Sequence, residues 1–145
     1  MATILTPGSH LLAVPFSAAT DFTELATYCE HFAQTMLESD DPALKMALLA
    51  RLNAALALLR PTLDDPIPPH LLEQFVADVL PEAPVFEPSP ELLCDYCLAL
   101  TQVLTLQGLP PETGKSLAGL LAELVWHFAG NLKAPRWETL PACGL

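Results

Sequence analysis

The amino-acid sequence predicts an all-α protein, a compact bundle of about five helices packed as antiparallel or orthogonal hairpins. Three observations support this prediction. Apolar residues recur at helical spacing along most of the chain, helix-capping residues precede these stretches, and proline-rich segments separate them. With 145 residues the chain has the length of one domain and can bury a core without a disulfide or a metal. We therefore expect a single domain over residues 1–145.

The segment 41–60 is predicted to be a central apolar helix around which the others pack. Asp40 or Asp41 can cap its first turn, and Pro42 suits the first helical position. At helical spacing the leucines fall on one side and the alanines on roughly the opposite side. These residues are Leu44, Leu48, Leu52, Leu56 and Leu59, and Ala43, Ala47, Ala50, Ala54 and Ala57. We expect neighbours on both faces; the alternative is an alanine face that packs on a second copy or a partner.

Four other helices are predicted from apolar stripes of helical period. They cover residues 22–38, 70–80, 89–107 and 111–132. Asp21 and Glu24 resemble a capping box at the first of them. Ser89 can cap the helix that begins at Pro90.

The segments between the helices are rich in proline. We expect 61–69 to be a stiff turn and 81–90 an extended connector, which Val85 and Phe86 anchor to the core. The apolar arm at 1–19 is broken by prolines, so we expect coil or short strands packed on its own domain; the alternative is a partner-binding segment. The tail at 134–145 should be irregular.

The charge of the chain indicates what it can bind. The formal net charge is −11 with only 6 lysines and arginines, so phosphate backbones and anionic membranes would be repelled. We expect no nucleic-acid and no membrane partner. The expected partner is a protein that is basic or has an exposed helix, or a second copy in a homodimer. An acidic nucleic-acid mimic is an alternative, although the acidic residues are scattered.

Several features favour a cytoplasmic location. Apart from His10, the first basic side chain is Lys45, so the N-terminus lacks the charged region of a secretory signal. Arg51 interrupts the central helix well short of the roughly 20 apolar residues that a membrane span needs. The 4 cysteines follow no disulfide-scaffold pattern, which suggests reduced thiols.

Cys94 and Cys97 form a C-x-x-C motif, a pattern that can bind zinc or cycle as a dithiol. Cys94 is expected more than a turn inside a helix, however, where no free backbone amides remain to stabilise a thiolate. Zinc would need about two more ligands. Cys29 and His31 point to opposite sides of their helix, so they cannot both serve. Cys29 with His127 could complete a site only if the helices at 22–38, 89–107 and 111–132 converge. We expect no metal and no cofactor; a thiol or zinc protein is the alternative.

Catalytic motifs are weak in this sequence. The segment 108–116, GLPPETGKS, superficially resembles a phosphate-binding loop, but it has one residue too many between its glycines and two prolines without N–H groups. The four histidines are dispersed, and no serine, histidine and acid combination stands out. We therefore predict that the protein is not an enzyme.

One surface is predicted to bind a partner. Trp126 falls off the apolar stripe of the last helix, on a ridge with Gly119, Glu123 and Gly130. Exposed tryptophan is enriched at binding hot spots, and the glycines allow close approach. The alternative is self-packing of Trp126 under the tail near Trp137. The sequence thus favours a protein that sequesters, chaperones or regulates a partner, such as a secretion chaperone, a toxin-neutralising protein or an anti-activator.

Overall fold

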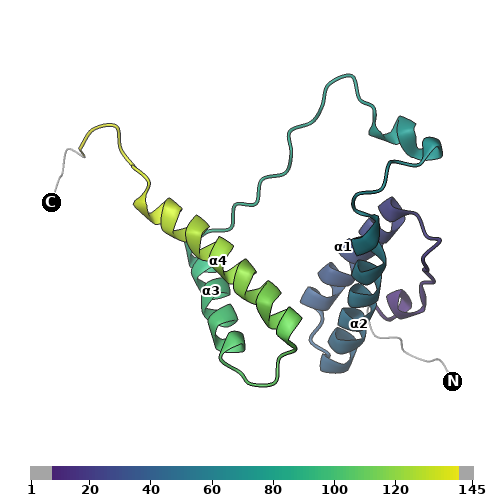
Figure 1. Cartoon of the computed structure of the whole chain (residues 1–145), viewed down its shortest axis with the longest axis horizontal. Helices are drawn as coiled ribbons and strands as arrows, with labels where there is room; N and C mark the ends of the chain where they lie inside the picture. The colour runs from purple at the N-terminus through teal and green to yellow at the C-terminus, as the bar shows by residue number, and fades with distance from the viewer. Residues whose placement is uncertain (1–7, 141–145) are drawn as a thin grey trace. The chain divides into compact units, whose positions relative to one another are not determined.

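The computed structural model describes residues 8–140, and its regular structure in this range is helical throughout (Figure 1). Helix accounts for 66% of these residues, and they contain no strand, which confirms the all-α prediction. The α-helices are α1 (Phe22–Glu38), α2 (Pro42–Leu59), α3 (Pro90–Leu104) and α4 (Pro111–Lys133). The 3₁₀ helices are η1 (Ser9–Ala13), η2 (Arg60–Thr62) and η3 (Pro69–Phe75).

The chain divides into two compact units, Met1–Asp78 and Val79–Leu145. In the first unit α1 packs against α2, and in the second α3 packs against α4. Short connections join the helices of each pair, at 39–41 and 105–110, which is typical of helical hairpins. The prediction that the whole chain is one compact bundle stays a prediction.

Side-chain caps fix the start of three α-helices, as the sequence predicted. An Asp21 carboxylate oxygen accepts a hydrogen bond from the Thr23 amide at 3.1 Å, at the start of α1. Asp41 caps α2 and Ser89 caps α3 in the same manner, at 3.0 and 3.3 Å. Each cap satisfies a backbone N–H group that has no partner within the helix.

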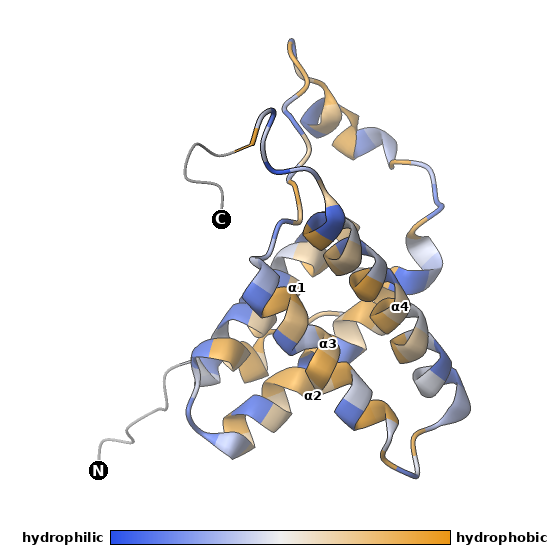
Figure 2. Cartoon of the chain, turned by 90° about the vertical axis from the view of Figure 1, so that its left-hand side faces the viewer, coloured by the Kyte–Doolittle hydropathy of each residue, from blue (hydrophilic) through white to orange (hydrophobic). Residues whose placement is uncertain are grey.

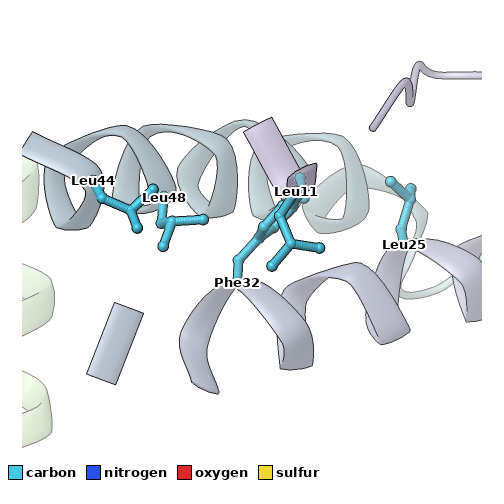
Figure 3. Close-up of a cluster of buried hydrophobic side chains, with 6 residues drawn as sticks. Leu11, Leu25, Phe32, Leu44 and Leu48 are labelled. Atoms are coloured by element: carbon cyan, nitrogen blue, oxygen red, sulfur yellow. The ribbon is translucent and has the colours of Figure 1, made fainter. Parts of the chain in front are cut away.

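The core of the first unit lies where α1, α2 and η1 meet. Figure 3 shows the side chains of Leu11, Phe32 and Leu48 in the space between the helices. The buried members of this cluster are Leu11, Leu25, Phe32, Leu44, Leu48 and Ala55. Leu11 belongs to the predicted arm, whose residues 8–19 contain η1 and no strand, while residues 1–7 lie outside the described range. The described part of the arm therefore packs on its own hairpin.

Arg51 is the one basic side chain drawn into this core in the described part of the chain. Its guanidinium carbon lies 4.3 Å from the ring centroid of Phe16 and 5.6 Å from that of Phe32. Its Nε and Nη2 atoms are buried without a hydrogen-bond partner among the described residues. Stacking on aromatic rings offsets part of the cost of this burial, because the guanidinium is planar and weakly hydrated. Arg51 thereby links the arm to both helices.

The predicted helix at 70–80 is wrong beyond Phe75. Only η3 forms, and Val76 already has an extended backbone, with φ −111° and ψ 129°. The helix start has no side-chain cap, and Pro81 disfavours helical geometry at Leu80. A helix this short needs tertiary packing to persist, yet Val79 and Leu80 are exposed. In η3 only Leu71 is buried.

The connector at 81–90 has no regular structure before Pro90, as expected from its prolines. The expectation that Val85 and Phe86 anchor it to the core is wrong, because both side chains are exposed. Bulk and hydrophobicity alone therefore did not identify buried positions in this segment.

The two faces of α2 differ in burial. Leu44 and Leu48 are buried against α1, whereas Leu56 is 51% exposed despite its place in the predicted leucine face. On the alanine face only Ala47 is partly buried, and the others are exposed: Ala43, Ala50, Ala54 and Ala57. Helix α2 is hydrophobic along most of its length (Figure 2). Neighbouring residues of the first unit cover only one of its faces.

By length and composition, the stretch Pro42–Thr62 passes as a membrane-crossing helix, and it is the one such stretch within residues 8–140. Core helices of soluble proteins have the same composition but are mostly buried, whereas 17% of this stretch is buried in the structure. Because Arg51 interrupts the apolar stretch, the helix is predicted not to span a membrane, and this stays a prediction.

Candidate functional site

The predicted ridge on α4 is exposed in the structure. Trp126 is 70% exposed, and Gly119, Glu123 and Gly130 are exposed as well. The spacing of these residues places them on one side of the helix. A Cβ atom built on either glycine would meet no atom within 4 Å, so the space above both is open. The interpretation of Trp126 as packed under the tail is not supported, because Trp137 is exposed too.

The opposite side of α4 carries the contacts with α3. Half-buried apolar residues occur there at helical spacing, namely Leu117, Leu121, Leu124 and Phe128. On α3 the fully buried residue is Leu93. Packing against α3 thus covers one side of α4 and leaves the Trp126 ridge, on the other side, uncovered by α3.

Charge on the ridge is close to balanced. Between Gly119 and Gly130 the only charged side chain is Glu123. Helical spacing brings Lys115 and Lys133 to the same side beyond the two ends. The chain's net charge of −11 therefore resides mostly elsewhere. Contact at the ridge would depend on the indole and the open backbone, and the overall charge would act at longer range.

The C-x-x-C motif lies inside α3, as predicted. The helix begins at Pro90, so Cys94 is past the first turn, where backbone amides already have helical partners. Both Cys94 and Cys97 are half-buried free thiols. No group of three or more His, Cys, Asp or Glu that could hold a metal ion occurs within residues 8–140. The pair alone supplies too few ligands for a structural zinc site.

Cys29 is a thiol at the edge of the first unit's core. Cys29 lies on α1, is half-buried and packs against the buried cluster, whereas His31 is exposed. Burial raises the pKa of the Cys29 thiol, because an apolar environment disfavours the charged thiolate. The raised pKa lowers the thiolate fraction of Cys29 at neutral pH, so this thiol is less nucleophilic than a solvent-exposed cysteine.

The raised pKa gives a testable pH dependence. We expect alkylation of Cys29 by iodoacetamide to reach half its limiting rate at a higher pH in the folded chain than in the unfolded chain. The folded state binds the thiol proton more tightly, so this contribution to stability is lost as the pH rises through the folded pKa. Mass spectrometry of the Cys29 peptide measures both profiles. The midpoint is compared rather than the rate, since burial also slows access, and equal midpoints would contradict the interpretation.

The segment that resembles a phosphate-binding loop is mostly helical. Glu112–Ser116 belongs to the first turns of α4, and its Gly114 amide already donates to the Pro110 carbonyl at 2.9 Å. A phosphate-binding loop requires free backbone amides that converge on the anion. The segment therefore has the character of a helix start, as the prolines suggested.

The histidines form no catalytic cluster with their described neighbours. All four are exposed, and the one side-chain interaction found for a histidine in this range joins His127 Nε2 to Asn131 Nδ2 at 3.4 Å. This pair lies on successive turns of α4. It is a surface contact between two polar groups.

The first unit contains a cavity of about 440 Å³ that the sequence did not reveal. Three segments line it: the start of α1 with the residues before it (18–25), the end of α2 with the turn that follows (58–63), and the proline-rich stretch 65–71. Its apolar lining consists mainly of Phe22, Leu25, Leu58, Leu59, Leu63, Ile67 and Leu71. In the sequence, only the apolar residues that flank the Pro-Ile-Pro-Pro stretch pointed to this cavity.

The polar side chains at the cavity are few. The Thr62 hydroxyl donates a hydrogen bond to the Leu59 carbonyl at 2.8 Å, and Asp21 is engaged in capping α1. Asp65 and His70 also line the cavity, and both are exposed. The cavity is thus an apolar space with an acidic margin.

These two surfaces, the Trp126 ridge and the cavity at 18–71, are the candidate sites of the molecule. Comparison with protein-family models, with curated proteins and with solved structures found no match to this chain.

Proposed function

We propose that the protein is a non-catalytic, acidic protein-binding module of the cytoplasm, which sequesters, chaperones or regulates a partner protein. The observation that carries this proposal is Trp126, a large apolar side chain that is 70% exposed on a regular helix. Tryptophan is among the residues most enriched at binding hot spots, where its loss costs about 2 kcal/mol or more. Covering the indole is therefore the largest single gain available to a partner on α4.

The shape of the ridge favours a helical partner. Gly119 and Gly130 flank Trp126, and the open space above them lets another backbone approach α4 closely. A helix with small or apolar residues on one face could pack on this surface, with Trp126 inserted between its turns. This geometry suits chaperones and anti-activators that hold a partner's amphipathic helix.

The charge of the chain favours a basic partner. At −11 the protein attracts positively charged surfaces over roughly the Debye length, about 8 Å at physiological ionic strength. Because the ridge carries one acidic side chain, Glu123, this attraction should act mainly on the rate of association. Binding should weaken with salt through slower encounter, while the Trp126 contact sets the rate of dissociation.

The test begins with affinity capture of the tagged protein from its native cells at low and high salt, with the partner identified by mass spectrometry. We expect one stoichiometric partner that is released by salt. Recovery of the protein alone in both washes would contradict the proposal.

With the purified partner, we expect Trp126→Ala to weaken binding about 30-fold or more, since about 2 kcal/mol corresponds to that ratio. The melting temperature should change little, because the indole is exposed. Trp137→Ala is the matched control: it removes the other tryptophan, which is also exposed but lies outside α4. A large drop in melting temperature for Trp126→Ala would show that the indole packs within the fold. Equal loss of binding in both variants would place the binding surface elsewhere.

A further inference from the structure

We propose that the cavity of the first unit binds a small apolar molecule that carries a positive charge. The proposal concerns residues 18–71 and is independent of the partner surface on α4. At about 440 Å³ the cavity has the size of small-molecule sites, which span about 300–1,000 Å³. Apolar side chains from three segments form most of its lining, among them Phe22 from the first segment, Leu59 from the second and Ile67 from the third.

The walls of the cavity are held in place without a ligand. Pro66 and Pro68 each fix a backbone dihedral in the segment that closes one side. Leu71 in the same segment is 4% exposed, so its side chain is held by packing. Phe75 stacks on Phe22, with ring centroids 5.7 Å apart and an interplanar angle of 17°. A ligand therefore finds a largely formed site and bears little of the entropy cost of ordering it.

The charges at the cavity select the sign of the ligand. Asp21, Asp65 and His70 line it, and no lysine or arginine among residues 8–140 does. Asp21 is engaged, since its carboxylate accepts hydrogen bonds from the Thr23 amide and hydroxyl, each at 3.1 Å. The Asp65 carboxylate makes no side-chain hydrogen bond or ion pair with another residue in 8–140, so it can pair with an incoming cation. The net charge of −11 further disfavours an anion.

These features define the ligand class as a lipophilic amine. Its apolar body would fill the space between Phe22, Leu59 and Ile67, and its ammonium group would lie at the margin beside Asp65. Because this ion pair is exposed to solvent, the charge should add only about three- to fivefold to the affinity. Most of the affinity would come from burial of the apolar body.

Three probes with the same ring test both parts of the proposal: 2-naphthylmethylamine, 2-naphthylmethanol and 2-naphthoate, which are cationic, neutral and anionic at neutral pH. The chain has only two isoleucines, Ile4 and Ile67, and Ile67 lines the cavity. In the full-length protein labelled at isoleucine methyl groups, the Ile67 signal, assigned with Ile67→Val, should shift saturably in NMR titrations. The amine should bind about three- to fivefold tighter than the alcohol at low salt, and the acid weakest.

Two neighbouring carboxylates provide a matched pair of variants. Asp65→Asn should lower the affinity for the amine to that for the alcohol, whereas Asp64→Asn should leave it unchanged, because Asp64 does not line the cavity. No saturable shift of Ile67 with any probe would overturn the cavity as a binding site. Equal affinities for the three probes, or equal effects of the two variants, would overturn the charge selectivity. Neither result bears on the Trp126 surface.

Discussion

Replacing Phe32 by alanine should lower the free energy of unfolding of the α1–α2 hairpin by about 3–5 kcal/mol. Phe32 is fully buried, and it is the largest side chain in the core cluster. Its ring centroid lies 6.0 Å from that of Phe16 and 6.4 Å from that of Tyr28, so truncation leaves a cavity among rigid groups that cannot close around it. Urea unfolding followed by far-UV circular dichroism measures the change.

The loss of the Phe32 ring also affects Arg51. Its guanidinium would keep only the contact with Phe16, while its Nε and Nη2 atoms would still lack hydrogen-bond partners in the described region. A poorly compensated buried charge is destabilising, so the effect should fall in the upper part of the range for aromatic truncation. Phe86→Ala is the matched control: this ring is 65% exposed, and its loss should change stability by less than about 0.5 kcal/mol. Similar effects of the two changes would show that Phe32 is not central to the core.

Helices whose start is encoded by neighbouring residues could be predicted from the sequence. The bounds Phe22–Glu38 were predicted for α1 and are observed, and the start of α3 at Pro90 follows from Ser89. In each case the capping side chain, the apolar stripe of helical period and the residues that follow all indicate the same helix start. Such signals are local, so they can be recognised without knowledge of the rest of the fold.

The predicted helix at 70–80 failed because its apolar stripe required a partner surface. Leu71 is buried, whereas Val79 is exposed. Helical periodicity states which residues could share a face, whereas the stability of a short helix depends on what that face contacts. The same reasoning explains Val85 and Phe86, whose hydrophobicity gave no information about neighbours.

The two candidate sites differ in how far the sequence could reveal them. The exposure of Trp126 follows from its angular position on α4, because one helix and one period define it. The cavity forms only where the start of α1, the end of α2 and the segment 65–71 lie side by side, and no periodic pattern in the sequence predicts this contact. Sites built from several distant segments are therefore the part of function that a single sequence conceals most.

The core of the second unit is small. Within the described residues of α3 and α4, Leu93 is the only fully buried side chain, and the rest of the contact surface is half-buried. A helical hairpin with one buried anchor gains little from the other contacts, so its stability depends on that residue more than the first unit depends on any one leucine.

Leu93→Ala should therefore cost about 2–5 kcal/mol, an amount comparable to the stability that such a hairpin can have. We expect the backbone amides of α3 and α4 to lose most of their protection against hydrogen exchange, because the helices would open together once the anchor is removed. Exchange measured by mass spectrometry over Pro90–Lys133 reports this directly. Leu98→Ala is the matched control, since it makes the same chemical change on the same helix at a position that is 53% exposed. If both variants retain protection, half-buried contacts such as those of Leu100 and Leu121 hold the hairpin together, and the stability of this unit is distributed along the helices rather than concentrated at Leu93.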